Sequence, residues 1–391
     1  MYDFDRIIER RGTDSIKWNG LEERFGSEDV IPLWVADMDF PAPDPVVRAV
    51  RERADHGIFG YTYNTERFYN AVTGWLKRRH GWEVFRDEIS FSPGIVTALV
   101  MIVKAFSKSG DQVLVQSPVY YPFFDVIRKN GRTVIDSPLV LGEAGRYEID
   151  FEDLEEKLAR KETTLMLLCS PHNPVGRVWT REELTRIGEL CLAHGVLVAA
   201  DEIHCDFVYP GHRFIPFMSL GEEMGMNGLS LMAPSKTFNM AGLKSSLVMA
   251  KDPEIFKAYN AVLDAHHLEG MNCFGLAGTV AAYEEGDEYV DQLIPYLEGN
   301  VTLVRNFLRE KMPQIKLIEP EGTYLLWLDC QAVSGDPRGL KDFFLKKARV
   351  ALSPGAVFGP TAHPFMRMNI GCPRSLIAEA LSRIEGAWKR S

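Results

Sequence analysis

The stretch that decides the fold is Thr-Leu-Met-Leu-Leu-Cys-Ser-Pro-His-Asn-Pro-Val-Gly, at residues 164–176. Its first part, 164–170, is a near-continuous apolar run, and a proline-rich turn that contains Asn173 follows at once. Near-continuous runs of this kind are typical of strands that are buried on both faces, as in parallel sheets covered by helices. The stretch therefore predicts an internal strand that ends in a polar turn.

Similar runs recur along the chain, and helical patterns lie between them. The other runs are Glu88–Ser92, Gln112–Gln116, Val196–Ala200, Leu229–Ala233 and Ser246–Ala250, and the intervening segments with helical patterns include Ile95–Ser107 and Arg181–His194. Thr180 is a candidate N-cap of the latter helix, and Glu183 completes a capping-box pattern. This alternation predicts an α/β fold with a mostly parallel sheet.

The last third of the chain has a different pattern. It predicts a long helix at Glu288–Lys311, a strand at Gly322–Leu328, and helices at Leu340–Ala348 and Ser375–Lys389. We expect a smaller α+β domain made of residues 1–47 and 289–391, beside a large domain at residues 48–288.

Composition excludes several classes of protein. The 391 residues carry a formal charge of −10, which argues against a nucleic-acid partner. No run reaches the roughly 18 apolar residues of a membrane span, and the charged N-terminus has no signal core. We expect a soluble, cytoplasmic protein that binds no membrane. The six cysteines form no C-x-x-C pair, and the neighbours His204 and Cys205 are a weak metal signal, so no metal site is expected.

Polar residues follow the successive runs, and ligands of open α/β sheets bind beyond the carboxyl ends of the strands. These residues are a Pro93-Gly94 turn that opens a helix at Ile95 and Val96, then Tyr120, Asn173, Asp201 and Lys236. The spacings, 28 residues from Asn173 to Asp201 and 35 from there to Lys236, each fit one βα unit.

These groups match the needs of pyridoxal 5′-phosphate (PLP). Helix N–H groups can bind its phosphate, and an aromatic side chain can stack on its ring. A carboxylate can pair with its pyridine nitrogen, and a desolvated lysine can react with its aldehyde. Each residue alone could have an ordinary structural role, such as an asparagine in a turn or a lysine at the surface. Only the placement of all of them after successive strands favours a cofactor site. No G-x-G-x-x-G pattern follows the first strand, which excludes a typical dinucleotide site.

At this point the sequence resembles the fold-type-I PLP enzymes of the aminotransferase-like superfamily. The resemblance rests on Ser-Pro-His-Asn-Pro-Val-Gly (170–176), Asp-Glu-Ile-His (201–204), Ser-Lys-Thr-Phe-Asn (235–239), Ala-Gly-Leu-Lys (241–244) and Arg-Met-Asn-Ile-Gly (367–371). Within that superfamily it is similar to the MalY/PatB-type C–S lyases, through Leu-Trp-Val-Ala-Asp-Met-Asp-Phe (33–40), Phe-Gly-Tyr-Thr (59–62), Ser-Pro-Gly-Ile-Val (92–96) and Asp-Glu-Ile-His-Cys-Asp (201–206).

The resemblance implies a role for each matching residue. Lys236 would form the Schiff base, Asp201 would pair with the pyridinium, Asn173 would contact the ring oxygen, and Tyr120 would stack on the ring. Ile95, Val96, Ser235 and Lys244 would hold the phosphate, together with Tyr61 of a partner subunit in a homodimer. Arg367 would bind the substrate carboxylate, and Asp37 and Tyr61 are also expected at the substrate. Many aminotransferases have a tyrosine where this chain has His204, a difference that favours the lyase branch.

Three functions stay open at this stage. The first is β-elimination from cystathionine or a similar sulfur amino acid, which yields a thiol, pyruvate and ammonia. The second is transamination through the same core residues. The third is a lyase with an added regulatory role as a binding partner. The 33–40 motif favours the lyase by resemblance.

Overall fold

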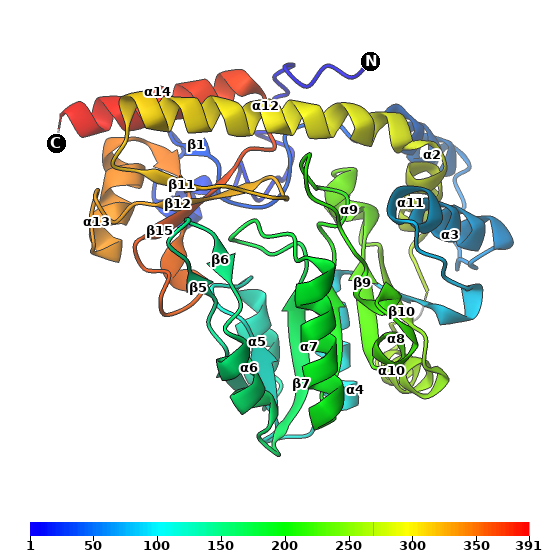
Figure 1. Cartoon of the computed structure of the whole chain (residues 1–391). Helices are drawn as coiled ribbons and strands as arrows, with labels where there is room; N and C mark the ends of the chain where they lie inside the picture. The colour runs from blue at the N-terminus through cyan, green and yellow to red at the C-terminus, as the bar shows by residue number, and fades with distance from the viewer. Residues whose placement is uncertain (269, 391) are drawn as a thin grey trace.

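A computed structural model describes residues 1–268 and 270–390, and a seven-stranded sheet forms its centre (Figure 1). Its strand order is β2 (Ile89–Ser92), β10 (Ser246–Ala250), β9 (Gly228–Met232), β8 (Leu197–Asp201), β7 (Thr163–Cys169), β3 (Gln112–Val115) and β4 (Thr133–Asp136). Strand β10 is antiparallel to both of its neighbours, and the other pairs are parallel. The predicted α/β class with a mostly parallel sheet is confirmed.

Alternate residues of the central strands enter two different cores, which explains their continuous apolar sequence. In β7, Leu165 and Leu167 pack on one face and Met166 and Leu168 on the other. The helices of the first face are α4 (Ile95–Phe106), α5 (Pro122–Arg128) and α10 (Pro253–Ala265), and those of the second are α6 (Phe151–Leu158), α7 (Arg181–His194) and α8 (Glu222–Met226).

A second, antiparallel sheet has the order β11 (Lys316–Ile318), β12 (Leu325–Asp329), β15 (Phe365–Asn369) and β14 (Ser353–Pro354). The long helices α12 (Asp287–Lys311) and α14 (Arg374–Lys389) lie side by side above it (Figure 1). Strand β1 (Ile31–Pro32) pairs in parallel with β13 (Val350–Ala351), so the start of the chain lies beside its last third. The division into domains at residues 47/48 and 288/289 stays a prediction.

Helices α2 (Asp44–Asp55), α3 (Glu66–His80) and α11 (Cys273–Glu285) pack together beside the central sheet. The remaining elements are short: α1 (Leu21–Phe25), α9 (Pro234–Thr237), α13 (Pro337–Lys341), the hairpin β5 (Val140–Leu141) and β6 (Tyr147–Glu148), the 3₁₀ turns Arg86–Glu88, Phe217–Ser219, Ala241–Leu243 and Gly355–Val357, and a π-helical turn at Asp342–Lys347. Among the described residues, no helix is both long and apolar enough to cross a bilayer.

Candidate active site

A cavity of about 270 Å³ opens at the carboxyl ends of the central strands. Of the ten residues expected to contact the cofactor, all except Tyr61 line it, namely Ile95, Val96, Tyr120, Asn173, Asp201, His204, Ser235, Lys236 and Lys244. They come from segments up to 149 positions apart in the chain. They meet because parallel strands deliver the residues that follow them to one edge of the sheet.

Lys236 enters the cavity from α9, the single helical turn that follows β9. Pro234 begins this turn, where a missing N–H costs nothing. The ammonium group donates a hydrogen bond to the backbone carbonyl of Ala36. Burial lowers the pKa of Lys236 to about 8, and Arg367 contributes, although Asp37 and Asp201 act in the opposite direction. Near neutrality the side chain therefore has a much larger neutral fraction than an ordinary lysine, and the neutral amine is the form that acts as a nucleophile or base.

Asp201 is the last residue of β8 and is 2% exposed. Its carboxylate accepts one hydrogen bond, from the backbone N–H of Ile203 at 3.2 Å. Burial raises the pKa of this carboxyl to about 7, while the Ile203 N–H and Lys236 lower it. A carboxylate with unused acceptor capacity in a buried site is suited to a cationic donor, which would stabilise its charged form.

Asn173 and Arg367 connect the cavity to the antiparallel sheet. The Nη1 atom of Arg367 donates to Asn173 Oδ1 at 2.9 Å, and its Nη2 donates to the Trp34 carbonyl at 2.9 Å. Its Cζ atom lies over the Phe358 ring, 4.8 Å from the centroid. Arg367 is 3% exposed, and burial lowers its pKa to about 10. A buried guanidinium held by neutral acceptors is prepared to bind a carboxylate.

The first turn of α4 forms another part of the cavity wall, at Gly94, Ile95, Val96 and Thr97. The first N–H groups of an α-helix have no acceptor within the helix, and they carry the positive end of its dipole. Ser235 and the exposed Lys244 lie on the same wall. Helix donors, a hydroxyl and an ammonium group together form a site for a phosphate.

Tyr120 and His204 supply the aromatic part of the wall. Burial raises the pKa of the Tyr120 phenol, so this side chain stays neutral. Burial also lowers the pKa of His204 to about 3, with contributions from Lys236 and Arg367. Both rings are therefore uncharged near neutrality.

Three predicted residues are not part of the cavity wall of this chain. Arg367 lies behind Asn173, to which it donates a hydrogen bond, and the other two are Tyr61 and Asp37. Tyr61 is fully exposed. The carboxylate of Asp37 pairs with Arg10 at 2.9 Å, and its backbone carbonyl accepts from Lys17 and Asn369. Asp37 thus fixes the N-terminal segment in this structure, and its expected contact with substrate stays a prediction.

The sequence and structure comparisons agree with this architecture. A family model described as aminotransferase class I and II matches residues 28–384. The chain belongs to this family. It is 46% identical to the cystathionine beta-lyase PatB of Bacillus subtilis, over 98% of this chain and 99% of that one.

Solved structures of the family superpose closely on the chain. Cystalysin from Treponema denticola, which contains PLP, has a TM-score of 0.97 and 35% identity, and covers 100% of this chain and 99% of its own. A PLP-bound protein from Clostridium difficile 630, named as an aminotransferase, has a TM-score of 0.97 and 39% identity, and covers 99% and 100%.

The residues of the cavity fit the cofactor of these family members. Asp201 has acceptor capacity left for a ring N–H, Lys236 has a lowered pKa, and the α4 turn offers free N–H donors. One contribution was missed in the sequence, because it comes from a backbone atom. The carbonyl of Ala36 accepts both the Lys236 ammonium and the Tyr324 hydroxyl, the latter at 3.0 Å. No residue type signals a backbone carbonyl, so sequence reasoning could not find it.

Proposed function

We propose that the protein is a PLP-dependent C–S β-lyase, which cleaves cystathionine or another cysteine-type substrate to a thiol, pyruvate and ammonia. The observation that carries this proposal is the placement of a lysine of lowered pKa and a buried aspartate in one cavity. The choice of reaction rests on 46% identity, over nearly the whole chain, to a protein named cystathionine beta-lyase.

Bound PLP supplies an electron sink for the charge that forms at the substrate Cα. Lys236 takes the proton from Cα, because its amine is buried and loses its own proton near pH 8. General-base catalysis of this kind contributes about 10²–10⁴-fold to the rate. Asp201 keeps a proton on the ring nitrogen by offering a buried negative charge. Arg367 holds the substrate carboxylate, and Asn173 orients the guanidinium at 2.9 Å.

The reaction is tested by incubating the purified holoenzyme with cystathionine and no keto acid. We expect equal amounts of pyruvate and thiol, and loss of both products in Lys236→Ala. Lys77→Ala is the matched control, since that lysine is 68% exposed and pairs with Glu83 at the surface. Absence of pyruvate in the wild type, with the cofactor absorbance present, would overturn the lyase proposal.

We also propose that the chain is a homodimer, in which Tyr61 reaches the phosphate site of the partner subunit. The segment around Tyr61 supports this proposal, because Ile58, Phe59, Tyr61 and Tyr63 are each more than half exposed. Contiguous exposed apolar side chains of this kind are typical of interaction surfaces. Sedimentation equilibrium measures the mass directly, and a single-chain mass at micromolar concentration would contradict the dimer.

Transamination is a second candidate, because one structure with a TM-score of 0.97 is named as an aminotransferase. Both reactions begin with removal of the Cα proton by Lys236, and they differ in whether the Cβ–S bond then breaks. Half-reactions with alanine, which lacks a leaving group, separate the two. An aminotransferase is expected to release one equivalent of pyruvate per active site from alanine. A lyase is expected to release pyruvate from alanine far more slowly than it turns over cystathionine.

A further inference from the structure

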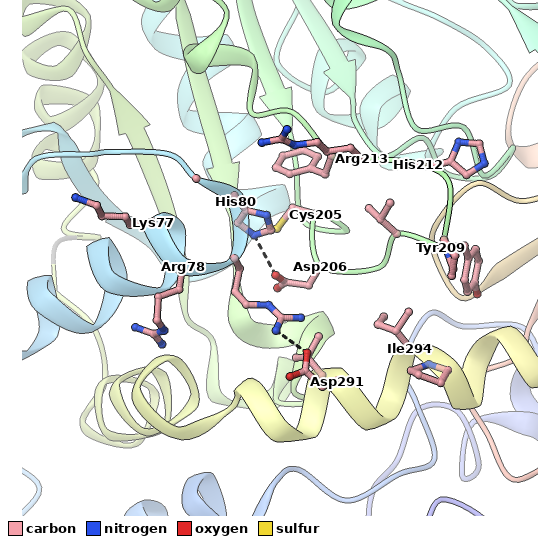
Figure 2. Close-up of a pocket in the computed structure, with 17 residues that line it drawn as sticks. Lys77, Arg78, His80, Cys205, Asp206, Tyr209, His212, Arg213, Asp291 and Ile294 are labelled. Carbon is pink, nitrogen blue, oxygen red and sulfur yellow. Dashed lines mark hydrogen bonds and ion pairs between the residues drawn. The ribbon is translucent and has the colours of Figure 1, made fainter.

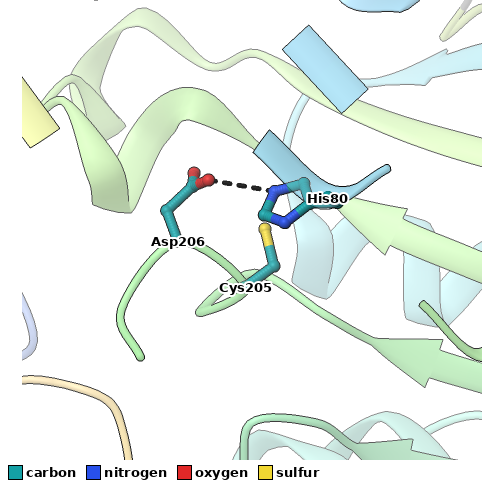
Figure 3. A group of neighbouring side chains, drawn as sticks. All are labelled: His80, Cys205 and Asp206. Carbon is teal, nitrogen blue, oxygen red and sulfur yellow. Dashed lines mark ion pairs between the residues drawn. The ribbon is translucent and has the colours of Figure 1, made fainter. Parts of the chain in front are cut away.

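A second cluster of reactive side chains lies outside the cofactor cavity. We propose that His80, Cys205 and Asp206 bind a divalent transition-metal ion, and that Zn²⁺ is the preferred one. His80 is the last residue of α3, whereas Cys205 and Asp206 follow β8. Figure 3 shows the three side chains converging from these two elements.

The spacing of the ligand atoms supports the proposal. One ligand atom from each residue lies within 4.8 Å of the other two. Zinc bonds of about 2.0–2.3 Å bring ligand atoms of a tetrahedral site to about 3.2–3.8 Å from one another. A separation at the 4.8 Å limit would therefore have to shorten by about 1 Å when the ion binds.

The nitrogen and the oxygen of the cluster already lie close together. His80 Nε2 and Asp206 Oδ1 lie 3.0 Å apart, at ion-pair distance, but their contact lacks hydrogen-bond geometry, and neither buried atom has another hydrogen-bond partner among the described residues. The side chains of His80 and Asp206 are 6% and 3% exposed, and Cys205 is 5% exposed. Buried polar atoms without a well-aligned partner need another one, and a cation that both can ligate provides it.

An outer residue already orients the proposed carboxylate ligand. Thr237 Oγ1 donates to Asp206 Oδ2 at 2.6 Å, which leaves Oδ1 turned toward His80. Metal-binding carboxylates are commonly held by such a second hydrogen bond. Thr237 is also the chain neighbour of Lys236, so the cluster and the cofactor cavity lie on either side of α9.

The cluster opens into a hollow of about 660 Å³ between α3, the loop after β8 and α12, which gives an ion and a fourth, water ligand a route from solvent (Figure 2). Two of the nearby arginines are paired with carboxylates. Arg79 pairs with Asp291 at 2.6 Å, and Arg78 pairs with Asp287 at 3.1 Å. Lys77 and Arg78 point away from Asp206 in the same view.

The mixed ligand set indicates which ion binds. A thiolate and an imidazole favour zinc over Mg²⁺ and Ca²⁺, which prefer oxygen ligands. Three protein ligands and one open position are the usual number for a tetrahedral zinc site with bound water. Binding would release the Cys205 thiol proton to solvent. The ion would tie the end of α3 to the loop after β8 and stabilise the folded chain.

The proposal is tested on the PLP-loaded protein with Zn²⁺ and with Co²⁺ as separate probes. The protein is first stripped of metal with a chelator, then incubated with Zn²⁺ and dialysed. Elemental analysis is then expected to find one Zn²⁺ per chain, and bound Zn²⁺ is expected to raise the melting temperature. Co²⁺ is expected to give the visible d–d bands of a tetrahedral thiolate site, at longer wavelengths than the cofactor absorbs. Cys205→Ser and His80→Asn should each weaken binding by more than about 100-fold, and Thr237→Val by about 10–100-fold.

Cys273→Ser is the matched control, because Cys273 lies on α11 outside the cluster and its loss should leave binding unchanged. Near-ultraviolet circular dichroism establishes that each variant is folded. Zn²⁺ binding that survives in both Cys205→Ser and His80→Asn would overturn the proposal, as would octahedral Co²⁺ bands or no bound metal in the wild type. None of these readouts depends on the lyase reaction.

Discussion

At the scale of single residues, the environment of Lys236 predicts a pH dependence of cofactor capture. Only the neutral amine attacks an aldehyde, and burial lowers the pKa of Lys236 from 10.5 to about 8. The rate of PLP uptake by the cofactor-free chain should therefore rise with pH and level off above about 8. Stopped-flow absorbance measures this rate, and a rate that still rose steeply near pH 10 would contradict the lowered pKa.

The same shift affects the stability of the cofactor-free protein. Between about pH 8 and 10.5 the unfolded chain binds a proton at Lys236 that the folded chain has lost. The contribution of Lys236 to the free energy of unfolding therefore increases with pH across this window. Below pH 8 both states are protonated, and the full cost of the buried charge is present.

We expect substitution of Arg367 to weaken substrate binding even when the new side chain keeps the positive charge. Arg367→Lys keeps a positive charge but loses the planar fork that Asn173 and Trp34 position. We expect kcat/KM to fall by about 10–100-fold, the effect of losing one charged hydrogen bond of about 1.5–3 kcal/mol. The matched control is Arg305→Lys, at an exposed pair with Glu319, which should leave kcat/KM unchanged. Equal effects of the two substitutions would argue against a substrate contact at Arg367.

At the scale of elements, the N-terminal segment is held by a buried ion pair. The Lys17 side chain is fully buried and lies 2.7 Å from Asp39, which is 5% exposed. Burial raises the pKa of the Asp39 carboxyl. Its contacts with Lys17, Trp18 and Arg10 outweigh this effect and hold the pKa below its ordinary value. Asp39 therefore stabilises the fold above the ordinary carboxyl pKa, and this contribution is lost as the pH falls through the lowered value.

Asp39→Asn leaves the Lys17 charge buried with a weaker partner, and we expect a loss of about 3 kcal/mol in the free energy of unfolding. Urea denaturation at neutral pH measures this loss. The comparison is Glu319→Gln at the surface, where breaking the ion pair with Arg305 should cost less than about 1 kcal/mol. A loss at Asp39 no larger than that at Glu319 would contradict the role of the buried pair.

Elements with local signals were predicted well from the sequence. Helix α7 has the predicted bounds, Arg181–His194, and its capping box forms, with the Glu183 N–H donating to Thr180 Oγ1 at 3.2 Å. Strand β4 was missed because it is an edge strand without a continuous apolar run, and only Ile135 in it is buried. The pairing of β1 with β13 joins residues more than 300 positions apart, and no local pattern records such a contact.

The candidate site was predictable for a related reason. Lys236, Asp201 and Asn173 each follow a strand that the apolar pattern reveals, so one rule of sheet geometry brings them together. The proposed metal cluster was not predicted, since His80 lies more than 120 positions from Cys205 and ends a helix of another part of the fold. In the sequence the adjacent pairs His204–Cys205 and His266–His267 were weak metal signals, and the structure places His204 in the wall of the cofactor cavity instead.

At the scale of the whole molecule, the proposed dimer predicts complementation between two inactive chains. If Tyr61 acts in the partner's site, Tyr61→Ala and Lys236→Ala remove residues of the same site from different subunits. Mixed dimers should then contain one intact site, and mixing should restore activity that neither variant has alone. The control is Tyr63→Ala, from the same exposed segment, which should stay active. Mixing that restored nothing, with mixed dimers present by native mass spectrometry, would contradict a shared site.

The path of residues 34–36 has a consequence for how the enzyme is made. Trp34 accepts from Arg367 and Ser353, and Ala36 accepts from Lys236 and Tyr324, so this early segment contacts partners 200 to 333 positions later. Because synthesis runs from the N-terminus, this segment emerges from the ribosome long before its partner residues have been synthesised. A nascent chain can form much of the central sheet, but Lys236 gains its full set of neighbours only when translation is almost finished. With the roles proposed for Lys236 and Arg367, newly made protein gains activity on amino acids only when the polypeptide is nearly complete.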